Sequence, residues 1–242
     1  MRRIILTILL LGAFSGSAHG MAVDISDDII HVTTGFNGAG ITVFGTQDEP
    51  GAVVLVIEGP PHPMTVRRKS RVMGLWTNTS WRDYSDVPSF YEVAASSPLS
   101  MVAAPDVLRE HHIGLDSLHV APEDGENTVQ DDAFTRELFT RMEQRRLFVP
   151  TVTPLAYPGP KLFKAHFAMP PIVTPGEYKV SAYLFADGKV IEQDSTSFNV
   201  VPEGLSADIR RFALEDGVLY GLCAIAMAMA AGWLATVLLK RE

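Results

Sequence analysis

Apolar residues run without interruption near the end of the chain. No residue is charged from Gly217 to Leu239, and the polar groups in this segment are few and mild. A helix of this length would be roughly 34 Å long, and the hydrocarbon core of a bilayer is about 30 Å thick. A helix that packs on a soluble core keeps a polar stripe, which this segment lacks. The pattern therefore predicts one transmembrane helix over Gly217–Leu239.

A second apolar run, Ile4–Phe14, lies at the start of the chain and is too short to span a bilayer comfortably. Two arginines precede it and small residues follow it, which is typical of a secretory signal peptide, here over residues 1–20. A signal peptide followed by a stop-transfer helix predicts that residues 21–204 are exported. Basic residues directly after the span place residues 240–242 in the cytoplasm, as the positive-inside rule expects.

Between these ends, short runs of apolar and β-branched residues favour strands. Ala52–Ile57 is a continuous apolar run, which is typical of a strand buried on both faces. From Tyr178 to Leu184 apolar and polar residues alternate, and the following Asp187-Gly188 is a strong signal for a two-residue hairpin. Many short strands with Gly- and Pro-rich turns predict a mainly β fold, an immunoglobulin-like β-sandwich over residues 21–204.

The middle of the chain changes to a helical pattern. Pro105–His112 is a short helix candidate, with proline in its first turn and a glycine after its end. Asp131–Leu147 is a longer one, because apolar residues recur every four positions, acidic residues lie at its start and arginines at its end. We therefore expect a helical insertion around residues 103–148. Apolar spacing after the last strand predicts an amphipathic juxtamembrane helix over residues 205–216.

Charge restricts the partners of the exported segment. Of the 20 basic and 28 acidic residues, four basic and one acidic lie in the signal peptide or the tail. The remaining 16 basic and 27 acidic residues give a net charge of −11, which disfavours nucleic acid and anionic lipid. The only cysteine, Cys223, lies in the predicted span. The exported segment therefore has no disulfide, no thiol nucleophile and no cysteine-ligated metal.

Motifs for catalysis or cofactor binding are missing. The sequence contains no nucleophile elbow, phosphate-binding loop or metalloprotease motif. Histidines are scattered, and His111, His112 and His119 do not have the spacing of a recognised metal site. We therefore expect no catalytic residues, no metal and no cofactor.

One dense basic cluster interrupts the acidic segment, namely Arg67, Arg68, Lys69 and Arg71. We expect a strand from Met64 to Met73, on which Arg67, Lys69 and Arg71 share one face while Arg68 lies on the other. This basic cluster is a candidate site for an oxyanion or for an acidic partner surface. The alternative is a charged edge strand whose charges prevent aggregation.

Two further sets of residues are candidates for contacts. Aromatic side chains gather around Pro88, namely Trp76, Trp81, Tyr84, Phe90 and Tyr91. They either form a binding face or pack a loop onto the core, and the second interpretation is favoured. Small residues recur on one side of the predicted span, namely Ala224, Ala228, Ala231, Gly232 and Ala235. Such a row allows another helix to approach closely. The alternative is that alanine is simply common in transmembrane helices.

Five segments carry a resemblance to a known family: TTGFNGAGITVFG (Thr33–Gly45), VRRKSRVMGLWTN (Val66–Asn78), PSFYEVAASSPL (Pro88–Leu99), PGEYKVSAYLFADGKV (Pro175–Val190) and LYGL (Leu219–Leu222). They resemble the Alph_Pro_TM family of alphaproteobacterial transmembrane proteins, over nearly the whole chain after the signal peptide. The family has no catalytic residues to carry over. Its members tend to be encoded near sulfite-exporter-like permeases, so the resemblance implies an integral-membrane permease as a partner.

The sequence therefore predicts a non-enzymatic, single-pass protein of the bacterial inner membrane, with a periplasmic β-sandwich and a cytoplasmic C-terminus. Its expected role is that of an accessory protein or interaction partner of a membrane transporter. The alternative is a periplasmic binding module that holds a small oxyanion between the basic cluster and the aromatic residues. An enzyme is the third interpretation.

Overall fold

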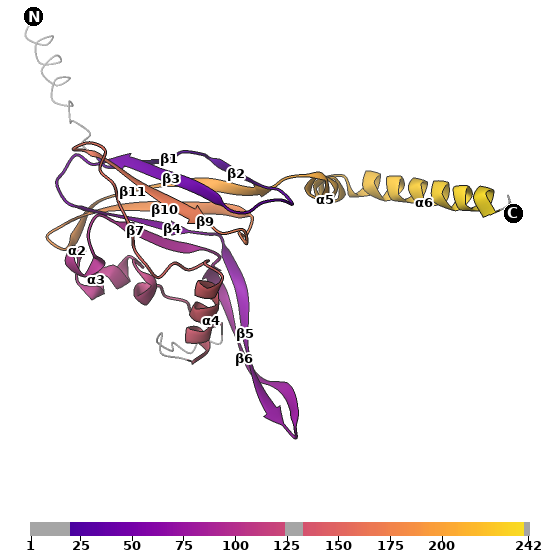
Figure 1. Ribbon diagram of the computed structural model, residues 1–242, viewed down its shortest axis with the longest axis horizontal. Helices are drawn as coiled ribbons and strands as arrows, with labels where there is room; N and C mark the ends of the chain where they lie inside the picture. The colour runs from indigo at the N-terminus through magenta and orange to yellow at the C-terminus, as the bar shows by residue number, and fades with distance from the viewer. Residues whose placement is uncertain (1–19, 124–132, 240–242) are drawn as a thin grey trace, which may run out of the picture.

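The computed structural model describes residues 20–123 and 133–239. Nearly all of the predicted signal peptide and the whole predicted cytoplasmic tail lie outside these residues. Within them the chain forms a body of strands and short helices, from which a long hairpin and a C-terminal helical segment project in different directions (Figure 1).

Seven strands come first, followed by short helices, four more strands and two C-terminal helices. In chain order they are β1 (Ala22–Ile25), β2 (Ile29–Val32), β3 (Ala39–Thr46), β4 (Ala52–Glu58), β5 (Pro61–Val72), β6 (Leu75–Pro88), β7 (Tyr91–Ala95), α2 (Leu99–Val102), α3 (Pro105–Glu110), the 3-10 turn η2 (Leu115–Ser117), α4 (Ala133–Gln144), β8 (Thr153–Pro154), β9 (Leu162–Met169), β10 (Gly176–Ala186), β11 (Lys189–Pro202), α5 (Leu205–Glu215) and α6 (Gly217–Leu239).

Two sheets enclose the apolar core. One has the strand order β1-β3-β9 and the other β2-β11-β10-β4-β7-β8. Neighbouring strands are antiparallel, except that β2 runs parallel to β11 and β7 runs parallel to β8. The mainly β, immunoglobulin-like sandwich predicted from the sequence is confirmed, with the helices inserted between β7 and β8.

Burial along the strands shows which sheet is covered on both faces. In β1 and β9 every second residue is buried, so the three-stranded sheet has one exposed face. Consecutive residues of β4 and most of β10 are buried, as the apolar run Ala52–Ile57 predicts. The short helices α2, α3 and α4 lie on the outer side of the six-stranded sheet (Figure 1). A ring contact joins the helical layer to the six-stranded sheet, because the centroids of His111, at the end of α3, and Tyr183, on β10, are 5.5 Å apart.

One acidic side chain, Glu92 on β7, is buried with only 5 % of its surface exposed. The Thr153 hydroxyl donates a hydrogen bond of 2.8 Å to its Oε1 atom, whereas Oε2 has no partner among the described residues. Burial raises the pKa of the Glu92 carboxyl, because the charged form loses its hydration, and the hydrogen bond from Thr153 only partly opposes this effect. The folded state therefore binds a proton here more tightly than the unfolded chain does.

We predict that Glu92→Gln stabilises the protein near neutral pH, because the folded protein then no longer buries a charged carboxylate. Glutamine keeps an acceptor for Thr153 and removes the buried charge. Because the folded pKa of Glu92 is raised, wild-type stability falls as pH rises from the unfolded pKa through the folded pKa. The gain should therefore shrink as the pH falls through the folded pKa, and it should be absent below the unfolded pKa of about 4.3. Thermal unfolding of the full chain in detergent at several pH values measures it, with the exposed Glu177→Gln as control; a gain independent of pH would contradict the explanation.

Candidate functional site

The two-stranded sheet β5–β6 projects from the sandwich, and we call Pro61–Pro88 the arm (Figure 1). Its strands have 12 and 14 residues and pair only with each other in the sheet order. Met73 and Gly74 join them with φ angles of 51° and 88°. Positive φ at both central residues is the type I′ turn, whose twist matches that of the flanking strands. The strand expected over Met64–Met73 thus ends at a tight turn that the sequence did not predict, because Met-Gly is a weaker hairpin signal than Asn-Gly.

The base of the arm is fixed to the body. Tyr84 on β6 is 1 % exposed, and its hydroxyl is 2.9 Å from the Thr135 hydroxyl of α4. The neighbouring Asp83 carbonyl accepts a hydrogen bond of 2.9 Å from the Glu123 amide. The Arg82 guanidinium lies over the Phe134 ring, 5.6 Å from its centroid. These contacts hold the base on the helical layer and define the direction in which the arm leaves the sandwich.

Beyond this base, most of the described side chains of the arm are exposed. The strand register places Arg67 opposite Trp81, Lys69 opposite Asn78 and Arg71 opposite Trp76. Residues directly opposite each other in an antiparallel pair point to the same face. Arg67, Lys69 and Arg71 therefore share a face, as strand alternation predicts, and this face also carries both indoles. Arg68 lies opposite Ser80 on the other face.

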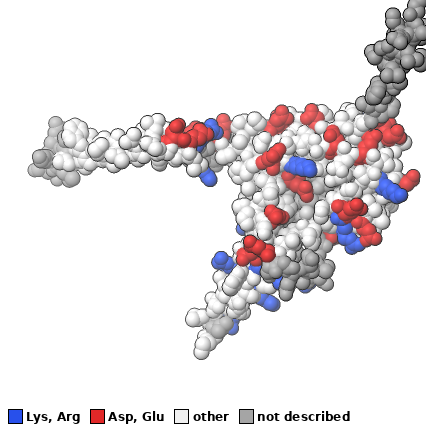
Figure 2. All heavy atoms as spheres, turned by 180° about the vertical axis from the view of Figure 1, so that it is seen from behind, with Lys and Arg blue, Asp and Glu red and all other residues white. Residues whose placement is uncertain are grey.

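This cationic and aromatic face is exposed, and at its tip the Arg71 Nε atom donates a hydrogen bond of 3.2 Å to the Gly74 carbonyl. Trp76 and Trp81 are 72 % and 67 % exposed, and Met73 at the tip is 99 % exposed. The segment from Met64 to Trp81 contains no acidic residue. None of the four residues of the basic cluster forms an ion pair with another described residue. Figure 2 shows basic side chains along the arm and acidic ones gathered mainly on the body and near its junction with the C-terminal segment.

The aromatic candidates divide into two groups. Trp76 and Trp81 lie on the exposed arm, whereas Tyr84, Phe90 and Tyr91 are buried at 0–1 % exposure. The expectation that a loop packs onto the core is thus right for Phe90, which precedes β7, but wrong for residues 75–88, which form strand β6. The Tyr91 hydroxyl donates to the His112 carbonyl at 2.7 Å and accepts from the Gly114 amide at 2.8 Å, so it supports the insertion.

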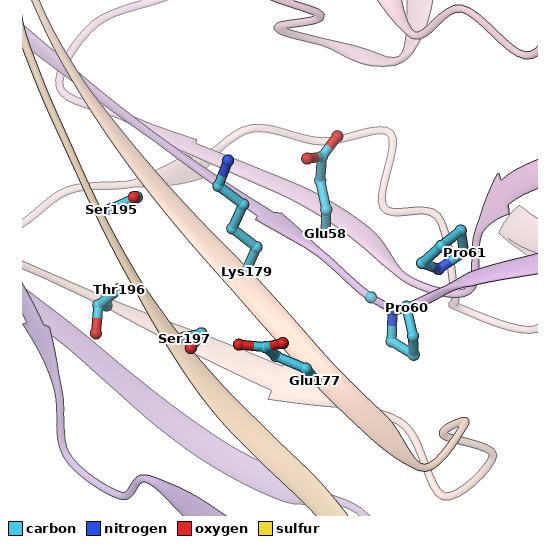
Figure 3. A pocket seen from close by; sticks show the side chains of 9 residues that line it. Glu58, Pro60, Pro61, Glu177, Lys179, Ser195, Thr196 and Ser197 are labelled. Carbon is cyan, nitrogen blue, oxygen red and sulfur yellow. The ribbon is translucent and has the colours of Figure 1, made fainter.

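A pocket of about 460 Å³ lies at the end of β4 and the start of β10, beside the first residues of the arm (Figure 3). Glu58, Glu177 and Lys179 line it together with Gly59, Pro60, Pro61, Ser195, Thr196 and Ser197. Lys179 lies opposite Glu58 in the strand register. Burial raises the pKa of the Glu58 carboxyl, and electrostatic interactions with Lys179 and His112 only partly oppose this effect. With two carboxyl groups and one ammonium group, the pocket does not favour an oxyanion.

The C-terminal helix α6 coincides with the predicted span, and the window Gly217–Thr236 is long and apolar enough to cross a membrane. None of this window is buried within the described chain. The five small residues of the candidate packing face lie on one side of α6 by their spacing, and a Cβ added at Gly232 would meet no atom within 4 Å. The Thr236 hydroxyl donates to the Gly232 carbonyl at 2.9 Å, which satisfies this polar group inside the span.

The sequence matches the family described as "Putative transmembrane protein (Alph_Pro_TM)" over residues 20–241. The chain belongs to this family. Together with the apolar helix α6, membership makes it a membrane protein. No curated protein matches the sequence.

Among solved structures, the chain is similar to one described as "Structural basis of T cell specificity and activation by the bacterial superantigen toxic shock syndrome toxin-1". The two are 8 % identical, with a TM-score of 0.26, over 76 % of this chain and 100 % of the other. A similarity this weak supports no argument about fold or function.

We predict that the exposed arm face contributes little to folding. Trp81→Ser should change the free energy of unfolding by less than about 1 kcal/mol, because a cross-strand pair is worth no more than that. Tyr84→Ala, three positions along the same strand, should cost about 3 kcal/mol or more, because it leaves a cavity under the arm and removes the contact with Thr135. Chemical denaturation of both variants measures this difference; equal losses would mean that Trp81 is packed.

Proposed function

We propose that this protein is a non-enzymatic, membrane-anchored interaction protein that binds a transporter in the same membrane. The sandwich lies in the periplasm of a bacterial cell, α6 crosses the inner membrane once and the C-terminus is cytoplasmic. The signal-peptide pattern and the basic residues after α6 support this orientation. The arm is the element that contacts the partner, and the association of the family with sulfite-exporter-like permeases supports a permease of this type.

The observation that carries the proposal is the shared face of the arm, on which Arg67, Lys69 and Arg71 of β5 lie beside Trp76 and Trp81 of β6. Charged residues on a sheet edge prevent unwanted strand pairing, and this would explain the cations alone. It does not explain two large indoles exposed beside them, because exposed aromatic surface promotes association. Trp and Arg are the residues that most often dominate the binding energy of protein interfaces.

The chemistry of the arm describes the surface that it fits. The three cations of this face fit carboxylates on a partner, since guanidinium and carboxylate groups form strong paired hydrogen bonds. The indoles require apolar surface around those carboxylates. The remainder of the exported segment is acidic, so an acidic partner is repelled by the body and attracted only by the arm. An acidic, partly apolar loop of a membrane protein meets these requirements.

The second contact is the small-residue side of α6. A permease presents transmembrane helices at the same depth, and small residues let helix backbones approach closely in lipid. Ala224, Ala228 and Gly232 would then lie against a partner helix while the arm binds the loop outside the bilayer. One contact lies within the bilayer and the other lies outside it. A partner that makes both contacts has to be an integral membrane protein.

We predict that charge reversal on the arm abolishes recovery of the partner. The triple variant Arg67→Glu, Lys69→Glu, Arg71→Glu turns attraction into repulsion and should reduce co-purification of the permease from native membranes by at least about tenfold, or 1.4 kcal/mol. Cross-linking in the membrane followed by mass spectrometry identifies the recovered protein. Recovery of the same permease with this variant would refute the role of the arm.

A matched control carries the same change of charge away from the arm. Lys164→Glu, Arg145→Glu and Lys189→Glu alter exposed residues of β9, of the segment after α4 and of the start of β11. This triple variant should co-purify the permease as the wild type does. A loss with both variants would show that net charge, rather than the arm, governs the association.

The alternative function is that of an oxyanion-binding module. It depends on the same uncompensated cations, since the pocket at Glu58 carries two carboxyl groups. Calorimetry of the full chain in detergent with sulfite, sulfate and organosulfonates separates the two functions. Heat of binding that is lost in the arm variant would favour the alternative; the proposed function predicts none.

A further inference from the structure

The helix α5 (Leu205–Glu215) has one apolar side that the rest of the described chain leaves largely open. Ile209 and Phe212 are three positions apart and therefore lie on the same side of the helix. Arg210 and Arg211 follow Ile209 at angles that place them away from this side. Ile209 is 47 % exposed, which is high for an isoleucine on the apolar side of an amphipathic helix.

A break separates α5 from α6. Asp216 has φ −120° and ψ 50°, outside the helical region, so the two helices do not form one rod. In Figure 1 the coils of α6 run along the horizontal axis, whereas α5 is seen nearly end-on, so α5 does not continue α6 in a straight line. The rings of Phe212 and Tyr220 meet edge-on with 5.9 Å between centroids. This contact holds the apolar side of α5 against the first turn of α6.

The first turn of α6 marks the boundary of the bilayer. A helix of 23 residues is about as long as the hydrocarbon core is thick, so its first turn lies at an interface. Tyr220 belongs to this turn and is a residue type that settles at the headgroup level. Because Phe212 contacts Tyr220, the apolar side of α5 lies at the same depth.

We propose that α5 lies flat in the headgroup layer of the bilayer that α6 crosses, on the side of the sandwich. Ile209 and Phe212 face the acyl chains, while Arg210 and Arg211 stay among headgroups and water. Amphipathic helices bind interfaces in this way, with the apolar side ~5–10 Å deep. The helix contains two acidic and two basic residues, so apolar contact rather than attraction to anionic lipid holds it. This inference is independent of any partner of the arm.

The consequence is a defined orientation of the sandwich. A domain joined to a span by a single connection tilts freely, whereas a second contact with the same bilayer restricts its tilt. The hairpin of β5 and β6 points away from the α6 axis (Figure 1). With α5 on the membrane, the arm extends sideways above the bilayer rather than into it.

Spin labels on the full chain in lipid vesicles test this placement. The background variant Cys223→Ala removes the only cysteine, and single labels are then attached at Ile209→Cys, Ala213→Cys and Arg211→Cys. Each label is exposed to oxygen, which concentrates in acyl chains, and to a water-soluble nickel chelate. A label at Lys189→Cys on the sandwich gives the value for water, and one at Ala228→Cys in α6 gives the value for lipid.

We expect high oxygen and low nickel accessibility at positions 209 and 213, and the reverse at position 211. Vesicles of phosphatidylcholine alone and vesicles containing phosphatidylglycerol should give the same pattern, because α5 carries no net charge. Equal nickel accessibility at all three positions would overturn the proposal, since α5 would then stand in water. Low accessibility to both reagents at 209 and 213 would also overturn it, because a protein rather than lipid would cover this side.

Discussion

Contact between α6 and lipid is the interaction on which the arrangement of this protein depends. The window Gly217–Thr236 has no part buried within the described chain, so no protein surface shields its leucine, isoleucine and methionine side chains from the surroundings. In hydrocarbon these side chains are well solvated, and a helix satisfies its own backbone groups. A single charge near the centre would cost about 2.5–3.5 kcal/mol. The absence of charge over the whole helix therefore matters more than any one of its residues.

The sandwich, in turn, gives the arm a rigid base. A two-stranded ribbon alone is at best marginally stable in water, and residues 67–81 of the arm have no core of their own. Tyr84, at the base of the arm, supplies the missing support, because its side chain is buried and its hydroxyl contacts the Thr135 hydroxyl of α4. The helical insertion thus has a mechanical role, since it covers one face of the six-stranded sheet and also fixes the arm. Stability lies at the base, and the exposed cations and indoles lie beyond it.

Much of the fold follows from local patterns in the sequence. Apolar runs identify β4 and α6, alternation identifies β10, and Asp187-Gly188 identifies its hairpin with β11. Strand β6 could not be predicted in this way, because its residues 75–83 have no buried face and so show no period. Its conformation is set by pairing with β5, a non-local interaction. The parallel pairing of β2 with β11 likewise joins the two ends of the sandwich and has no local signal.

The candidate site was predictable only in part for the same reason. The basic cluster is visible as composition, and its division between two faces follows from strand alternation. Trp76 and Trp81 join the face of Arg67 and Arg71 because of the register across the turn at Met73-Gly74. The irregularity opposite Arg68 and Lys69 also contributes to this placement. One extra residue in β6 decides which side the indoles take. Composition alone does not contain this information.

A single chain with a lipid-embedded contact and a water-exposed contact has a property that neither contact has alone. In the proposed function, a partner helix packed against α6 would restrict the arm to the volume above that partner, so that binding of the arm would become an intramolecular step at high effective concentration. Each contact can then be individually weak, which suits an exposed ribbon whose ordering is already provided by Tyr84. The same logic makes the direction of the arm decisive, because a contact that cannot be reached gains nothing from proximity. If α5 is fixed on the membrane surface, it sets that direction, so a helix that touches no partner can still determine which neighbours the arm binds.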